Sequence, residues 1–267
     1  MASFRNAKAQ AAHLIKQLQG TNNHIKGVGT ARNYEDRLTQ IAKLLKENKD
    51  NPDFKNKSLK DLNTSLAQKI LAHQAQHAGQ KTLDMDRQAM QSVLQNITHD
   101  LKNHERLLDQ SGHVHTSEIQ QELKPRAYTS EQVELIKSHQ NEANGFSTEL
   151  AYRCGLRASE LQPLQPLSER SPSDRPANTE KFSGLEGKLY TTDGKGSLVR
   201  TICIPTKLAE QLESYRLPEP IQIKDRRIDI FQHYNIGGGQ RWSNSFSRAS
   251  NKALGWSNGA HGLRHSE

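Results

Sequence analysis

Three short segments of the sequence carry basic and imidazole side chains, which can bind anions and transfer protons. The segment CGLRASEL holds Arg157, DGKG holds Lys195 in a tight turn, and HGLRH holds His261 and Arg264. Guanidinium groups bind phosphate oxygens through planar, paired donors, and lysine and histidine can transfer protons. On a helix, residues three or four apart share a face, which places His261 beside Arg264.

Each segment also has an ordinary interpretation when it is taken alone. Arg157 and Glu160 are three residues apart and can form a common helical ion pair. Lys195 between two glycines is typical of a solvated loop tip. His261 and His265 have the i, i+4 spacing of a metal-binding pair, but the sequence has no HExxH motif or evident third ligand, so no metal site is expected.

The composition narrows the class of protein further. The chain has 267 residues and a formal net charge of +8, and its pI near 9.4 favours a polyanionic partner such as nucleic acid. No apolar run approaches the ~18 residues of a membrane span, and no secretory signal is visible. Two cysteines, Cys154 and Cys203, are too few for a disulfide framework or a four-ligand zinc site, so a cytoplasmic protein is expected.

The elements that must position these segments divide into two groups. Residues 1–110 have the apolar spacing of helices, which predicts a short helix over Ala7–Leu18 and longer ones over Tyr34–Leu45, Leu59–Ile70 and Met90–Leu101. These helices can bury a small core.

Residues 111–128 lose the helical periodicity and are interpreted as a linker, so a second domain is expected over 129–267. Thr129 supplies a helix N-cap, and a further helix over Ser147–Leu161 is expected to carry Arg157 in its middle. The polar, proline-containing stretch Gln162–Ser183 is expected to be a loop.

A β-hairpin is predicted in the middle of the second domain. Leu189–Thr191 and Val199–Ile204 have strand-like composition, and Asp193-Gly194 between them is a strong turn signal. Helices are expected over Thr206–Tyr215 and Arg241–Leu254, and HGLRH looks like the start of another. The expected fold class is therefore mainly α with a small β-hairpin or sheet.

The order of the three segments resembles the catalytic set of the tyrosine recombinase, or phage integrase, family. GLRASEL resembles that family's first arginine box, GKGSLVRTICIP its hairpin-lysine segment, and HGLRHS its second box, H-x-L-R-H. The resemblance covers nearly the whole chain, because residues 1–110 fit the family's helical core-binding domain. It implies a mixed α+β catalytic domain over 129–267.

The resemblance also implies a chemistry, in which a tyrosine phenolate attacks a DNA phosphodiester and leaves a 3′-phosphotyrosine and a free 5′-hydroxyl. Arg157 and Arg264 would hold the non-bridging oxygens, Lys195 would protonate the leaving oxygen, and His261 would act in proton transfer. Glu160 would orient the arginine. No metal or other cofactor is implied.

Two further points follow from the family pattern. His265 would give structural support to the second box. The interval from Arg157 to Lys195 is longer than is usual in the family, so Lys188 and Lys207 are alternative candidates for the hairpin lysine.

The implied partner is double-stranded DNA carrying an attachment site, held between both domains, with four protomers on two duplexes in the full-length protein. Eight basic residues are candidates for DNA contact, five of them placed at helix starts of the first domain: Lys26, Arg32, Arg37, Lys81, Arg87, Arg241, Arg248 and Lys252.

The sequence departs from the family pattern at its end, where the nucleophilic tyrosine is expected. All six tyrosines precede His261, and the last of them is Tyr234. The catalytic domain is thus expected to be incomplete, in a truncated protein or a natural fragment that cannot cleave DNA covalently. Two alternatives stay open: a non-catalytic DNA-binding remnant or regulator of an integrase from a mobile genetic element, and a basic helical module that binds RNA or protein.

Overall fold

The computed structural model describes residues 6–20, 24–48, 50–120, 125–173, 179–194 and 198–265. The chain divides into two compact units, Met1–Leu123 and Lys124–Glu267, each with a hydrophobic core of its own. Helices dominate both units, and the second adds two small antiparallel sheets. The predicted fold class, mainly α with a small β part, is confirmed.

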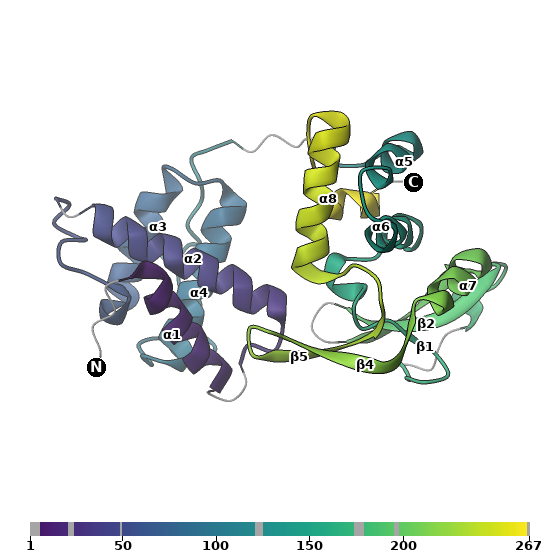
Figure 1. Cartoon of the computed structure of the whole chain (residues 1–267). Helices are drawn as coiled ribbons and strands as arrows, with labels where there is room; N and C mark the ends of the chain where they lie inside the picture. Colours follow the sequence, from purple (N-terminus) through teal and green to yellow (C-terminus); the bar gives the residue numbers. More distant parts are fainter. Residues whose placement is uncertain are drawn as a thin grey trace. The chain divides into compact units, whose positions relative to one another are not determined.

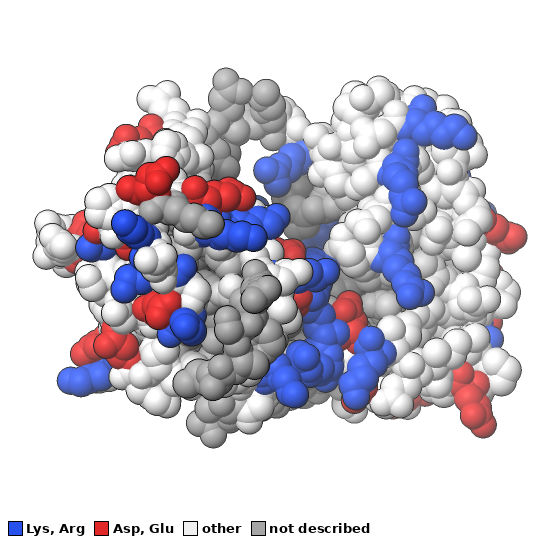
Figure 2. Space-filling view, turned by 60° about the vertical axis from the view of Figure 1, so that its left-hand side comes forward, with Lys and Arg blue, Asp and Glu red and all other residues white. Residues whose placement is uncertain are grey.

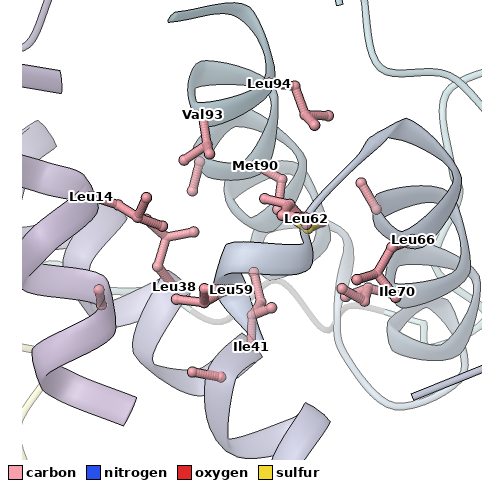
Figure 3. Packing of buried hydrophobic residues seen from close by; sticks show 14 of the residues in the cluster. Leu14, Leu38, Ile41, Leu59, Leu62, Leu66, Ile70, Met90, Val93 and Leu94 are labelled. Carbon is pink, nitrogen blue, oxygen red and sulfur yellow. The ribbon is translucent and has the colours of Figure 1, made fainter. Parts of the chain in front are cut away.

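Five helical segments build the first unit. They are α1 (Ala7–Gly20), α2 (Val28–Glu47), the 3-10 helix η1 (Leu59–Asp61), α3 (Thr64–Ala75) and α4 (Gln80–Asn96). Their apolar faces meet in one core, to which Leu14, Leu38 and Met90 contribute from three different helices (Figure 3). The helical periodicity of residues 1–110 therefore corresponds to a packed bundle of helices.

Two of the expected helices in this unit have different bounds. The predicted helix over Leu59–Ile70 is divided, because Asn63 caps a new helix by accepting a hydrogen bond from the Leu66 amide at 2.8 Å. The predicted helix over Met90–Leu101 already ends at Asn96. In both cases local backbone capping ended the helix while the apolar spacing continued.

The second unit contains more elements. They are α5 (Ser130–Lys137), α6 (Glu142–Cys154), η2 (Ala158–Glu160), β1 (Gln165–Pro166), η3 (Thr179–Phe182), β2 (Gly187–Asp193), β3 (Val199–Pro205), α7 (Thr206–Ser214), β4 (Arg216–Asp225), β5 (Ile228–Tyr234), α8 (Gly239–Leu254) and η5 (Ala260–His265). The helices α5, α6 and α8 pack against one another, and α7 packs on β2 and β3 (Figure 1). Buried Trp242, Phe246 and Tyr128 lie in the core of this unit.

The predicted hairpin is present as β2 and β3, which pair antiparallel from Gly187 opposite Pro205 to Asp193 opposite Val199. The short strand β1 pairs with β2 and completes a sheet of three strands. The predicted cap at Thr129 is also present, as a reciprocal capping box with Gln132.

The prediction of a single helix over Ser147–Leu161 is wrong, and the difference affects the site. Helix α6 ends at Cys154, since Gly155 adopts a left-handed conformation with φ of 60° and closes the helix end. Arg157 is consequently the cap of the 3-10 turn η2 and does not lie inside a helix.

A second hairpin, β4–β5, has no counterpart among the sequence-based expectations. Strand β4 contains Pro218 and Pro220, which are unfavourable in a sheet interior, and the turn at Arg226-Arg227 lacks the usual Gly or Asn. Among the described residues, no helix is long and apolar enough to cross a membrane.

Candidate functional site

Arg157 and Glu160 form the base of the site on the turn η2. The Arg157 guanidinium donates from Nη1 to Glu160 Oε1 at 2.6 Å, and the Arg157 backbone amide donates to Oε2 at 2.8 Å. The Glu160 side chain has no exposed surface, whereas 38% of the Arg157 side chain is exposed. The carboxylate therefore holds the arginine in place and leaves part of its guanidinium free to meet a ligand.

A third residue, Arg200 on β3, shares the same carboxylate. Its Nη2 donates to Glu160 Oε2 at 2.9 Å, and its Nε donates to Oε1 at 3.4 Å. Burial acts to raise the pKa of the Glu160 carboxyl, but the hydrogen bonds and charge of Arg200, together with Arg157, outweigh burial and hold that pKa below its usual value. Glu160 is thus a buried, ionised group with two cationic partners.

Arg264 joins this group from η5, at the far end of the chain. Its Nε donates to the carbonyl oxygen of Gly155 at 2.7 Å, so the end of α6 anchors it. Burial lowers the pKa of Arg264, and the nearby positive charges of Arg157 and Arg200 lower it further. The three guanidinium groups therefore lie within Coulombic reach of one another, and we call Arg157, Arg200 and Arg264 the arginine cluster.

Gly262 allows η5 to approach the rest of the unit. A Cβ atom at this position would collide with the Arg126 carbonyl oxygen and would lie 2.6 Å from the Tyr128 ring. Close packing thus requires a glycine at this position of HGLRH, because the turn that carries Arg264 lies directly on Tyr128.

The β2–β3 hairpin meets the arginine cluster through the Thr192–Arg200 pair, one pair before the end of the ladder. Thr192 Oγ1 donates to the Glu160 carbonyl oxygen at 2.5 Å, and Thr192 is the cross-strand partner of Arg200. Lys195 itself lies outside the described residues. The hairpin is nevertheless joined to η2 at the end from which its turn extends.

The alternative lysines lie away from this contact. Lys188 is exposed on β2 opposite Ile204, four residues from Thr192, which corresponds to roughly 13 Å along a strand. Lys207 is exposed on α7, beyond the end of β3. The structure brings neither of them to the arginine cluster.

The two histidines of HGLRH are placed differently from the arginine. His261 is exposed and lies three residues before Arg264 on η5. His265 is the last residue of η5, and its side chain lies outside the described part of the structure.

Helix α8 presents a basic face beside the site. Arg241, Arg248 and Lys252 are exposed and are spaced seven and four residues apart, so they share one side of the helix, while Trp242 and Phe246 are buried on the other. Helix α8 also packs on the 3-10 turn η2, whose N-cap is Arg157. Figure 2 shows one face of the molecule, on which a row of Lys and Arg side chains runs down the right-hand part of the view.

Three of the first unit's candidates are accessible near helix starts. Lys26 precedes α2 and is exposed, Arg32 is half-buried in the first turns of α2, and Lys81 is exposed at the start of α4. Backbone amides at helix starts favour anions, so these positions suit phosphate contacts.

The other two candidates of this unit are not at helix starts, and that part of the expectation was wrong. Arg37 lies within α2 and makes a paired contact with the buried carboxylate of Asp86, at 2.6 and 2.9 Å. Arg87 lies within α4 and is 8% exposed. Arg37 thus joins α2 to α4, whereas Arg87 donates to Gln91 on its own helix at 3.0 Å.

The chain's tyrosines near the sheet are not arranged as nucleophiles. The hydroxyls of Tyr190 and Tyr234 both donate to Glu213 Oε1, at 2.7 and 2.8 Å, and both rings are buried. Burial and the Glu213 carboxylate raise the pKa of each phenol. A raised pKa disfavours the phenolate that would attack a phosphate.

The site shows no metal-binding group in the described residues, in which no three His, Cys, Asp or Glu side chains come together. Cys154 and Cys203 are free thiols, and burial raises the pKa of Cys154 to about 12.

Sequence reasoning missed Arg200, although the strand pattern contains a signal for it. Arg200 lies on the same face of β3 as Ile202 and Ile204, which are buried. An arginine on the core face of a strand needs a buried anionic partner, and Glu160 is that partner.

No protein-family model matches the sequence, and no curated protein matches it. Among solved structures, the XerH site-specific recombinase bound to its difH substrate, in a pre-cleavage complex, is 15% identical over 99% of this chain and 84% of that chain, with a TM-score of 0.44. Its post-cleavage complex with palindromic difH is 15% identical over 99% of this chain and 85% of that chain, with a TM-score of 0.46. The Tn1549 transposon integrase in complex with transposon right end DNA is 14% identical over 96% of this chain and 84% of that chain, with a TM-score of 0.45. These structural similarities are weak, so the function is inferred from this chain's own side chains.

Proposed function

We propose that this protein is a site-specific DNA recombinase of the tyrosine type, which binds duplex DNA and holds one phosphodiester in the arginine cluster. The observation that carries the proposal is the convergence of Arg157 and Arg264, from segments more than a hundred residues apart, around buried Glu160. Paired guanidinium donors match the non-bridging oxygens of a phosphate.

The arrangement suits a transition state that gains negative charge. A phosphorane carries more charge than the phosphodiester from which it forms, and fixed cationic donors stabilise it without reorganisation. His261, on the same turn as Arg264, is assigned to proton transfer, and Lys195, which follows β2 in the sequence, to protonation of the leaving 5′-oxygen.

The proposed reaction is strand cleavage and rejoining through a 3′-phosphotyrosine, for which a tyrosine must reach this phosphate. A homo-tetramer on two DNA duplexes is proposed as the assembly that carries it out. Tyr190 and Tyr234 are bound to Glu213, so neither of them is proposed as that nucleophile.

DNA contact is proposed to extend over α8 through Arg241, Arg248 and Lys252, and over the first unit through Lys26 and Arg32, with Lys81. Arg37 and Arg87 are left out, because the first is paired with Asp86 and the second is buried.

The test measures the affinity for a duplex of about 30 base pairs over a range of salt concentrations. We expect log K to fall steeply with log salt, and Arg157→Gln and Arg264→Gln each to weaken binding by about tenfold at low salt. Arg153→Gln is the matched control, because Arg153 lies on α6 in an exposed pair with Glu149. Flat salt dependence, or equal losses in all three variants, would contradict the proposal.

A further inference from the structure

We propose that Arg200 is a positioning residue of the phosphate site, which aims Arg157 at the phosphate by sharing the buried Glu160 carboxylate with it. The inference rests on the proposed function, since it concerns the same site. It assigns a role to a residue on the β2–β3 hairpin that itself lies next to neither arginine box in the sequence.

The carboxylate contacts show why one arginine alone would not hold the other in place. Each oxygen of Glu160 accepts one bond from Arg157 and one from Arg200. If Arg200 were absent, Oε2 would keep only the backbone amide of Arg157, and the carboxylate could rotate. Because Glu160 is fully buried, water is not available to replace the lost donor.

The charges of the site give a second argument. Glu160 and Arg157 alone would be an electrically neutral pair, which has little attraction for an anion. With Arg200 and Arg264 included, three guanidinium groups face one carboxylate, and the net charge of these four groups is +2. The fold therefore holds like charges together, and a bound anion relieves their repulsion.

The hairpin supports Arg200 from its own side. Thr192, directly across from Arg200, is buried and bonded to the Glu160 carbonyl oxygen at 2.5 Å. Two adjacent contacts thus tie η2 to the hairpin, one to the side chain of Glu160 and one to its backbone. A displacement of the hairpin would move Glu160 and, with it, Arg157.

Both arginines that bind Glu160 keep surface that a ligand could reach. The exposed fraction is 36% for the Arg200 side chain and 38% for the Arg157 side chain, although they meet on a carboxylate with no exposure.

The test uses sulfate as a tetrahedral dianion whose charge is constant between pH 5 and 8. Its dissociation constant is read from the side-chain NMR signals of the arginine cluster in the whole chain. We expect Arg200→Gln to weaken sulfate binding by about tenfold, and Arg200→Lys, which keeps the charge but loses the paired bonds, by about threefold. Arg170→Gln is the matched control, because Arg170 also anchors to β2 but bonds Asp193 and Thr191 instead of Glu160.

A double-mutant cycle separates positioning from direct contact. If Arg200 acts through Glu160, Arg200→Gln weakens sulfate binding much less in the Glu160→Gln variant than in the wild-type chain. The loss of binding free energy should be less than about a third of the loss in the wild-type chain. An equal effect in both backgrounds overturns the proposal, because Arg200 would then act on the anion directly.

The pH profile is the readout that a purely structural role would not move. The charged groups around Glu160 are Arg157, Arg200 and Arg264, and His261 on η5 is present in every variant. Loss of Arg200 removes the largest influence that keeps Glu160 ionised, so the change of sulfate affinity between pH 8 and pH 5 should differ between Arg200→Gln and the wild-type chain. Parallel profiles count against the inference.

The inference and the proposed function can fail separately. If Arg157→Gln and Arg264→Gln weaken sulfate binding and neither Arg200 variant does, only the role of Arg200 is refuted. If no variant of the arginine cluster changes sulfate binding, the phosphate site itself is refuted.

Discussion

Glu160 is the residue on which the site depends most directly. A carboxylate without exposed surface stays ionised only when charged or hydrogen-bonded donors surround it, and Glu160 has four such bonds from two arginines. The same bonds orient the guanidinium groups, so the residue that is chemically inert in the proposed reaction decides where the reactive charges lie.

The ionisation of Glu160 predicts how stability changes with pH. Its pKa is lower in the folded chain than the ordinary value of about 4.3, so its contribution is present at neutral pH and is lost as pH falls below that value. We expect Glu160→Gln to lower the free energy of unfolding by about 1–3 kcal/mol at pH 7 and to flatten its decline between pH 5 and 3. Urea unfolding followed by tryptophan fluorescence measures both effects, and an equally steep decline in the variant would refute them.

At the scale of elements, α8 combines two roles on its two faces. Trp242 and Phe246 fasten it in the core of the second unit, and this attachment gives Arg241, Arg248 and Lys252 fixed positions on the exposed side. A fixed row of charges can follow the phosphates of a duplex more closely than the same charges on a loop.

Arg248→Gln tests the exposed face of α8. We expect DNA affinity to fall about threefold and the slope of log K against log salt to decrease by about 1, since one phosphate contact is lost. Lys207→Gln on α7, which lies beyond the far end of the β2–β3 hairpin, is the control and should change neither quantity. Similar losses in both variants would mean that only net charge matters.

The β4–β5 hairpin forms although the residues of its turn are unfavourable for a turn of this kind. Arg226 and Arg227 both have positive φ, 48° and 63°, a conformation in which side chains other than Asn and Gly are strained. The register of the two strands beyond the turn is nevertheless regular from Asp225 opposite Ile228 to Ile221 opposite Gln232. Pairing of the strands outweighs the strain of the turn.

Relief of this strain should stabilise the second unit. The double variant Arg226→Asn with Arg227→Gly is expected to raise the free energy of unfolding by about 1 kcal/mol, because the new residues favour positive φ. The variant with alanine at both positions removes the same charges and keeps the strain. If the alanine variant is stabilised as much, the gain comes from charge and not from backbone conformation.

At the scale of the whole molecule, the two units have separate cores and each buries its own apolar residues. The boundary lies inside the stretch interpreted as a linker, but that stretch is partly structured. Ser117 and Glu118 bond to Ala78 and Ala75 of the first unit, and Tyr128 belongs to the core of the second. The packing contacts therefore locate the boundary between the two units more closely than the loss of helical periodicity in the sequence does.

Separate cores predict separate unfolding transitions. Both tryptophans of the chain, Trp242 and Trp256, belong to the second unit, whereas helices contribute to circular dichroism in both. We expect the urea midpoints from fluorescence and from circular dichroism at the helix band to differ in the absence of DNA. Coincident midpoints would show that the units unfold as one.

The sequence by itself determined the helices of the first unit, the β2–β3 hairpin and the two boxes around Arg157 and Arg264. These depend on short-range patterns, namely apolar spacing, an Asp-Gly turn and a few neighbouring side chains. Only the tertiary structure decided that β4 and β5 pair and that Arg200 shares the Glu160 carboxylate. Each of these depends on contacts between residues distant in the sequence, whose free energies outweigh local preferences and leave little trace in a single sequence.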